Sequence, residues 1–141
     1  MKRTLLIFLI VFILMQFIRP EQKNIATQKD LEIKAPLEVM TVLKSSCYDC
    51  HSNNVVWPAY SQIAPFSWII SSHVKNGRKA LNFSIWENYT DEEKQHELKQ
   101  IYRTVYAAMP LQSYIVMHEE ADLTKEQRLL IRDWTGIRKR N

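Results

Sequence analysis

One short run of this sequence carries residue types that together can support redox chemistry. Cys47, Cys50 and His51 form a Cys-x-x-Cys-His pattern, which is the attachment signal for c-type haem. Positions i, i+3 and i+4 of a helical turn share one face, so both sulfurs can reach the two vinyl groups of one porphyrin. The imidazole of His51 then points at the iron as the proximal ligand. The pattern predicts one covalently attached haem c.

Three other uses of the two cysteines stay open beside haem. A zinc site needs a fourth ligand besides Cys47, Cys50 and His51, and usually a second pair of cysteines. A thioredoxin-like dithiol is expected in a βαβ context, whereas this chain is patterned for helices. Two buried free thiols are less expected in an exported chain than in the cytosol. The spacing and the N-terminal segment described below both favour haem.

A sixth iron ligand has to come from elsewhere in the chain. Met109, followed by Pro110, ends a predicted helix and enters a loop, and thioether sulfur is a good ligand for low-spin haem iron. We therefore predict Met109 as the second axial ligand. His118, Met117, His73 and an open sixth position are the alternatives, and a core-filling role is the other interpretation of Met109.

Other side chains could support the haem. A metal-binding imidazole needs an acceptor for its second nitrogen, and we expect a backbone carbonyl in a loop marked by Pro58 or Pro65. Tyr60, Tyr114 and Arg78 are candidates for hydrogen bonds to the propionates. The tryptophans are expected to wall the haem and fill the core: Trp57, Trp68, Trp86 and Trp134.

Helices must position these residues. Thr90 and Thr124 each begin a capping box, with Glu93 and Gln127 three residues later. The predicted helices cover about 36–47, 65–77, 90–107 and 124–136, the second and fourth stopping at glycines. Within the third, a buried stripe at helical spacing is predicted from Leu98, Ile101, Tyr102, Val105 and Tyr106. No stretch alternates as a strand does, so the fold class is all-α, a small cytochrome c-like helical domain.

The N-terminal residues have the pattern of a membrane-inserted segment. Residues 4–18 are apolar except for Thr4 and Gln16, and Lys2 and Arg3 precede them. We predict a single N-terminal transmembrane helix within residues 1–19, with a cleaved signal segment and a buried core helix as alternatives. No small residues stand where a signal peptidase would cut. Basic residues before the segment hold the N-terminus in the cytoplasm, so the haem domain is expected to face the periplasm.

Length and charge limit the remaining possibilities. The 141 residues suffice for one domain. The net charge of +4 comes from the two ends, because acidic residues outnumber basic ones in between. No basic face remains there for a nucleic acid, so none is expected as a partner. The predicted organisation is a membrane anchor at 1–19, a polar linker at 20–35, the haem domain at 36–137 and a basic tail at 138–141.

Four segments of the chain resemble the haem-binding domain family of bacterial envelope proteins, a divergent branch of the c-type cytochromes. They are residues 47–70, 77–89, 109–118 and 121–134, and the resemblance extends over 36–137. It implies a single covalent haem in a small helical domain that is often tethered to a membrane. The family pattern has Pro after the histidine that matches His118, whereas this chain has Glu119, which weakens a ligand role for His118.

These features together predict a protein anchored in the inner (cytoplasmic) membrane, with its haem domain in the periplasm. Its expected function is one-electron transfer between redox partner proteins, through a haem ligated by His51 and Met109. An electron carrier or haem-binding module is expected rather than an enzyme, and no residue is assigned a catalytic role. The alternatives are a gas or redox sensor or a peroxidase-like domain with an exchangeable sixth ligand, and a subunit that presents haem to a larger complex.

Overall fold

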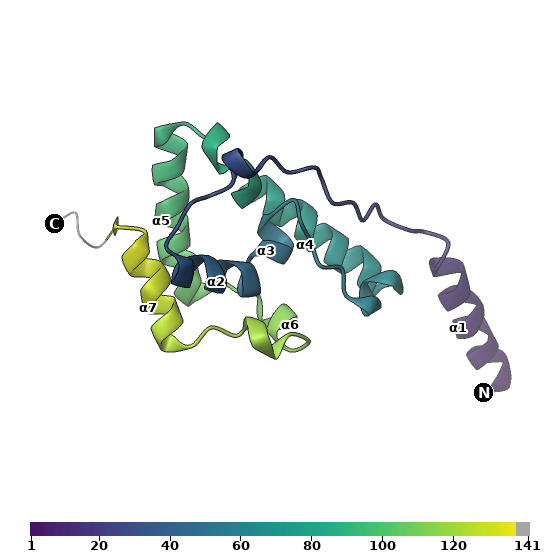
Figure 1. The fold of residues 1–141 in the computed structure, drawn as a ribbon. Coiled ribbons are helices and arrows are strands. Elements are labelled where there is room, and N and C mark those ends of the chain that lie inside the picture. The colour runs from purple at the N-terminus through teal and green to yellow at the C-terminus, as the bar shows by residue number, and fades with distance from the viewer. Residues whose placement is uncertain (138–141) are drawn as a thin grey trace.

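The computed structural model describes residues 1–137 and is helical there, with no strand in that range (Figure 1). The α-helices are α1 Lys2–Met15, α2 Leu37–Ser46, α3 Tyr48–His51, α4 Phe66–Ala80, α5 Asp91–Ala107, α6 Gln112–Ile115 and α7 Lys125–Trp134. The 3₁₀ helices are Lys29–Leu31, Ala59–Gln62, Phe83–Asn88 and Glu119–Ala121. The predicted all-α class is confirmed. The predicted basic tail at 138–141 lies outside the described residues.

Two helices begin where the capping boxes predict. The Thr90 hydroxyl accepts a hydrogen bond from the amide of Glu93 at 3.2 Å, and the Glu93 carboxylate accepts one from the Thr90 amide at 2.8 Å. Thr124 and Gln127 make the same reciprocal pair at 3.2 and 2.8 Å. Each cap satisfies backbone donors at a helix start and stabilises it by about 1 kcal/mol. These caps set the starts of α5 and α7.

The second predicted helix does not stop at its glycine. α4 continues through Gly77 to Ala80, and the chain becomes extended at Leu81. Gly136, in contrast, lies beyond the end of α7 with a φ of +70°, a conformation that favours glycine. The two glycines therefore have different roles, and the sequence pattern alone does not distinguish them.

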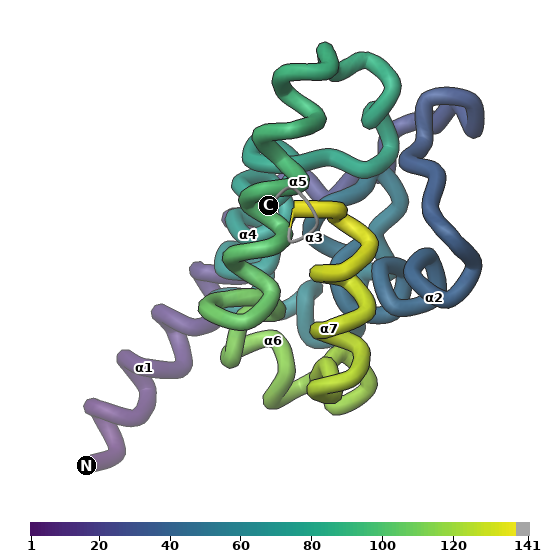
Figure 2. Tube along the Cα trace, turned by 90° about the vertical axis from the view of Figure 1, so that its left-hand side faces the viewer, coloured from purple at the N-terminus to yellow at the C-terminus, as the bar shows by residue number. Residues whose placement is uncertain are grey.

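The core lies among α2, α5, α7 and the 3₁₀ helix Phe83–Asn88. α5 packs along α7, and Figure 2 shows the two side by side. Of the predicted stripe, Ile101 and Val105 are buried, and Leu98 packs against the core from a half-buried position. Tyr106 is exposed, and the guanidinium of Arg132 lies over its ring at 4.9 Å from the centroid. The predicted buried stripe is therefore confirmed at Ile101 and Val105 and wrong at Tyr106.

α1 is the one helix that projects away from the rest of the described chain (Figures 1 and 2). It has 14 residues, none of them buried, and it ends at Met15. At 1.5 Å per residue its length is about 21 Å. No helix within residues 1–137 is both long enough and apolar enough to cross a membrane. This finding corrects the predicted transmembrane helix, because the chain leaves the helix where Gln16 binds the backbone of Ala64.

The segment after α1, expected to be a polar linker, lies along the domain. The side chain of Asn24 pairs with both backbone groups of Val55, at 3.0 and 2.9 Å. Further on, Ile33 is buried in the core, and its amide donates to the carbonyl of Phe83 at 2.9 Å. Polar side chains that pair with backbone groups, rather than apolar residues, hold the first part of this segment in place.

Candidate haem site

The Cys-x-x-Cys-His motif folds as a single helical turn that faces a cavity. Cys47 caps the N-terminus of α3, and Cys50 and His51 lie on that turn. All three side chains line one cavity of about 640 Å³. A volume of this size is in the usual range for a cofactor pocket. The turn therefore brings both thiols and the imidazole to the same space, as the spacing predicts.

His51 is oriented by a carbonyl that the sequence analysis did not identify. Its Nδ1 lies 3.1 Å from the carbonyl oxygen of Leu81, the residue that follows α4. A neutral imidazole that donates from Nδ1 keeps Nε2 free to ligate a metal. Burial lowers the pKa of His51, which favours this neutral form. The expected acceptor in a loop at Pro58 or Pro65 is wrong, because the end of α4 passes the ring instead.

The two cysteines are free thiols in the structure. Burial, and to a lesser extent the neighbouring Cys50, raise the pKa of Cys47 to about 12. Burial and the charge of Asp49 raise the pKa of Cys50 to about 11. Both are therefore protonated at neutral pH. Within residues 1–137 no three His, Cys, Asp or Glu side chains are grouped as a metal-ion site.

Helices from the whole domain wall the cavity. α4 packs against α3, and α5 packs against α7, so the cavity lies between these two pairs. Most of its wall is aliphatic or aromatic. The apolar lining residues are Leu43, Ala80, Leu81, Phe83, Ile101, Val105, Leu111, Leu123 and Ile131. An apolar wall of this kind suits a large flat macrocycle, and polar side chains complete the lining, among them Asn76, Glu97, Gln100 and Thr104.

Met109 lines the same cavity as His51, from the loop between α5 and α6. Its amide donates to the carbonyl of Thr104 at 2.8 Å, and its carbonyl accepts from Nη1 of Arg128 at 2.9 Å. The same guanidinium nitrogen also donates to the carbonyl of Val105. Arg128 on α7 thus ties the end of α5 to this loop. The backbone of the predicted sixth ligand is held from two sides.

The alternatives to Met109 are placed differently. His73 lines the cavity from α4. His118 does not line it: its Nε2 is 2.6 Å from the Tyr60 hydroxyl, and its Nδ1 is 3.1 Å from a Glu120 carboxylate oxygen. Met117 is exposed and also lies outside the lining. Of these candidates, Met109 and His73 share the cavity with His51, and His96 of α5 also lines it.

A hydrogen bond that sequence reasoning missed joins the haem motif to α6. The hydroxyl of Tyr114 donates to Asp49 Oδ2 at 2.6 Å, and Asp49 Oδ1 accepts from the amide of Val56 at 3.0 Å. The Tyr114 ring stacks on His118 with centroids 4.2 Å apart. This Asp49–Tyr114 contact fastens the segment after Met109 to α3. No local sequence pattern predicts this contact, since the two residues are 65 positions apart.

Two sets of expected haem neighbours are not at the cavity in the described chain. Arg78 donates instead to backbone carbonyls of Ser52, Lys23 and Asn53, at 2.6, 3.1 and 3.2 Å. None of the four tryptophans lines the cavity. Trp86 is buried in the core beside it. The expectation of a tryptophan-walled haem is wrong, because apolar residues of α2, α5 and α7 make that wall.

Gly77 is a site residue that the sequence analysis misread. A Cβ built on it would lie 2.4 Å from the carbonyl oxygen of Cys50. Real Cβ atoms do not approach a backbone oxygen that closely, so only glycine lets α4 pass this near to α3. An interior helical glycine points to close packing, but the predicted helix ends at Gly77, so the sequence gives this signal only once the helix is known to continue to Ala80.

We expect Gly77→Ala to displace the haem motif. Overpacking of backbone against backbone costs about 3 kcal/mol, so the midpoint of thermal unfolding and the haem content of the purified protein should both fall. Gly136→Ala is the matched control. It meets no atom within 4 Å, and its positive φ costs only about 1 kcal/mol, so haem content should stay unchanged. Equal haem content in both variants would contradict the close packing.

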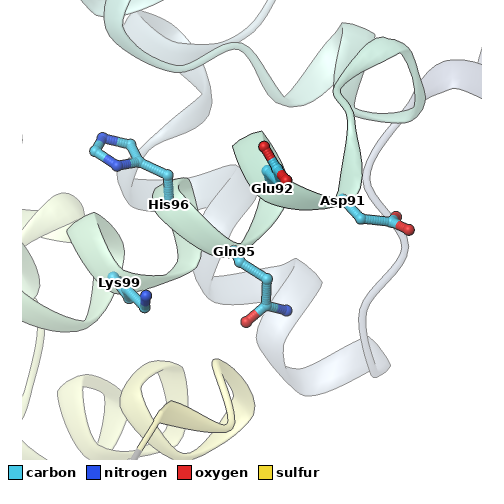
Figure 3. A pocket seen from close by; sticks show the side chains of 5 residues that line it. All are labelled: Asp91, Glu92, Gln95, His96 and Lys99. Carbon is cyan, nitrogen blue, oxygen red and sulfur yellow. The ribbon is translucent and has the colours of Figure 1, made fainter.

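A second hollow lies along the first half of α5 and shares His96 with the cavity. Its side chains are those of Asp91, Glu92, Gln95, His96 and Lys99, and Figure 3 shows them pointing in different directions. They do not converge on a common point, as a cofactor site requires. The cavity behind the haem motif is the candidate site.

A largely apolar cavity with two thiols, an oriented imidazole and a thioether on its wall defines a small, all-helical haem-binding protein. The comparison with family models agrees: residues 10–136 match the haem-binding domain model. The chain belongs to the haem-binding domain family. Neither the curated proteins nor the solved structures contain a match.

Proposed function

We propose that this protein is a c-type haem electron carrier. The observation that carries the proposal is that Cys47, Cys50, His51 and Met109 line one cavity. Cys47 and Cys50 would bind the haem through thioethers, and His51 and Met109 would hold its iron. A bound haem supplies an iron that gains and loses one electron.

The residues around the cavity hold the side chain of His51 and the backbone of Met109 in place, and they provide an apolar wall. Leu81 fixes the ring of His51 through its carbonyl, so the imidazole does not have to reorient when the charge at the site changes. Arg128 holds the backbone of Met109. The largely apolar wall would bury much of the macrocycle, which limits solvent rearrangement around it. A site held in this way is suited to electron transfer rather than to substrate turnover.

Optical spectra of the purified chain, made in cells with a cytochrome c maturation system, test the proposal. Low-spin six-coordinate spectra are expected in both redox states, with the weak red absorption band of methionine ligation in the ferric state. A high-spin ferrous spectrum with rapid carbon monoxide binding would contradict the carrier and favour a gas sensor or peroxidase-like protein. Zinc without haem in the purified chain would contradict haem binding itself.

The location is also part of the proposal: α1 attaches the protein to the inner membrane, with the haem domain in the periplasm. Leucine, isoleucine and phenylalanine side chains of α1 are about half exposed or more, and no other element covers them. Lys2 and Arg3 begin the helix. An apolar helix of this kind favours a lipid environment. Flotation of the full chain with lipid vesicles tests attachment, and recovery of all the protein away from the vesicles would contradict it.

A further inference from the structure

A patch of exposed apolar side chains lies on the haem domain near the end of α1. It is formed by the first turn of α4, by Ile63 three residues before that helix, and by the two residues that follow α6. Its members, with their exposed fractions, are Ile63 48%, Phe66 54%, Ile69 47%, Val116 70% and Met117 59%. Tyr60 links the two halves, because its ring meets Phe66 with centroids 6.3 Å apart and its hydroxyl bonds His118.

The chain around this patch lacks charge. Between Asp49 and Lys75 there is no Asp, Glu, Lys or Arg, although these residues make up 24% of the whole sequence. The run includes Trp57, Tyr60 and Trp68, and tryptophan and tyrosine are the residues that favour the boundary between lipid and water. An uncharged aromatic and aliphatic surface of this kind is costly in water and suits a lipid surface.

Hydrogen bonds tie the patch to the end of α1. Gln16 bonds both backbone groups of Ala64, at 3.3 and 3.0 Å, and Ala64 follows Ile63 of the patch. The indole of Trp68 donates to the carbonyl of Ile18 at 2.7 Å. The point where α1 ends is therefore set against the start of α4. A bilayer that receives α1 is brought directly to the patch.

We propose that this patch lies on the lipid surface of the membrane that holds α1, so that the haem domain has a fixed orientation there. The inference rests on the proposed attachment through α1 and adds a second, separate contact. In the sequence, charge returns after the patch at Glu119 and Glu120, which follow Met117 and His118. A protein partner on the same patch is the competing occupant.

The test uses the full haem-loaded chain in vesicles of phosphatidylethanolamine and phosphatidylglycerol. The vesicles carry a trace of phospholipid with a photoactivatable acyl chain. After illumination, peptide mass spectrometry should find lipid adducts in α1 and in residues 63–70. It should find none on the exposed face of α5. Adducts on α1 without any on 63–70 would overturn the patch contact and leave the attachment intact. A chain that does not float with the vesicles would overturn both.

A double variant tests the lipid contact of the patch independently of the attachment through α1. Phe66→Glu with Ile69→Glu changes two exposed side chains, so the fold and the haem spectrum should be unchanged. Lipid adducts on 63–70 should fall about tenfold, while those on α1 remain. Leu37→Glu is the matched control, because Leu37 is 83% exposed at the start of α2, outside the patch. Equal adduct yields in the two variants would overturn the inference.

The competing occupant is tested in cells. A benzoylphenylalanine photo-crosslinker placed at position 66 of the full chain should form adducts with lipid when the cells are illuminated. A crosslink from position 66 to one discrete protein would overturn the lipid surface and identify a docking partner instead.

Discussion

Replacing both Cys47 and Cys50 by serine is expected to abolish covalent haem. A serine hydroxyl does not form the thioether that a cysteine thiol makes with a haem vinyl group. In the structure both thiols are free and line the same cavity, which is the arrangement that attachment needs, and burial raises the pKa of each. Haem staining after denaturing electrophoresis should give a band for the wild type and none for the double variant, in cells with the maturation system.

Met109→Ala is the control for this experiment. It alters a residue of the same cavity without removing a sulfur that would form a thioether, so its stained band should persist. If the double serine variant kept a band through denaturation, the haem would be attached elsewhere and the assignment of these cysteines would be wrong.

Met109→Ala is itself expected to open the iron to external ligands. The structure places Met109 on the wall that it shares with His51, and no other methionine of the described chain lines that cavity. Without the thioether, carbon monoxide should bind the reduced protein at least about tenfold faster, and the reduction potential should fall. Stopped-flow binding and a redox titration measure the two effects.

Met117→Ala is the matched control, because Met117 is exposed and lies outside the cavity. It should leave the carbon monoxide rate and the potential unchanged. His73→Ala tests the remaining candidate that lines the cavity. If His73→Ala opened the site and Met109→Ala did not, the sixth ligand would be His73.

The hydrogen bond between Asp49 and Tyr114 shows why some contacts of the site could not be predicted from the sequence. Their hydrogen bond joins residues 65 positions apart, and it exists only because α6 folds back onto α3. The carbonyl of Leu81 that orients His51 is another such contact, since any residue offers a carbonyl and no pattern marks this one. Arg78, an attractive propionate donor by residue type, is directed to backbone carbonyls by the packing of α4.

Local rules, in contrast, predicted the elements that depend on neighbours along the chain. The capping boxes at Thr90 and Thr124 act within four residues, so they specify the starts of α5 and α7 before any packing occurs. The one-turn geometry of the haem motif is equally local. The end of α4 was misjudged because a glycine both terminates helices and permits close packing, and the contact between Gly77 and Cys50 decides between these uses.

The sequence by itself determined the helical class, the haem motif and the membership of the haem-binding domain family, because each follows from residue types at short spacing. The tertiary structure decided which distant residues share the cavity with His51. It brought Met109 and His73 to the wall, and it engaged His118 in hydrogen bonds with Tyr60 and Glu120. The reason is physical: contacts between residues far apart in the chain depend on how the helices pack, and that packing minimises the free energy of the whole domain rather than of any one segment.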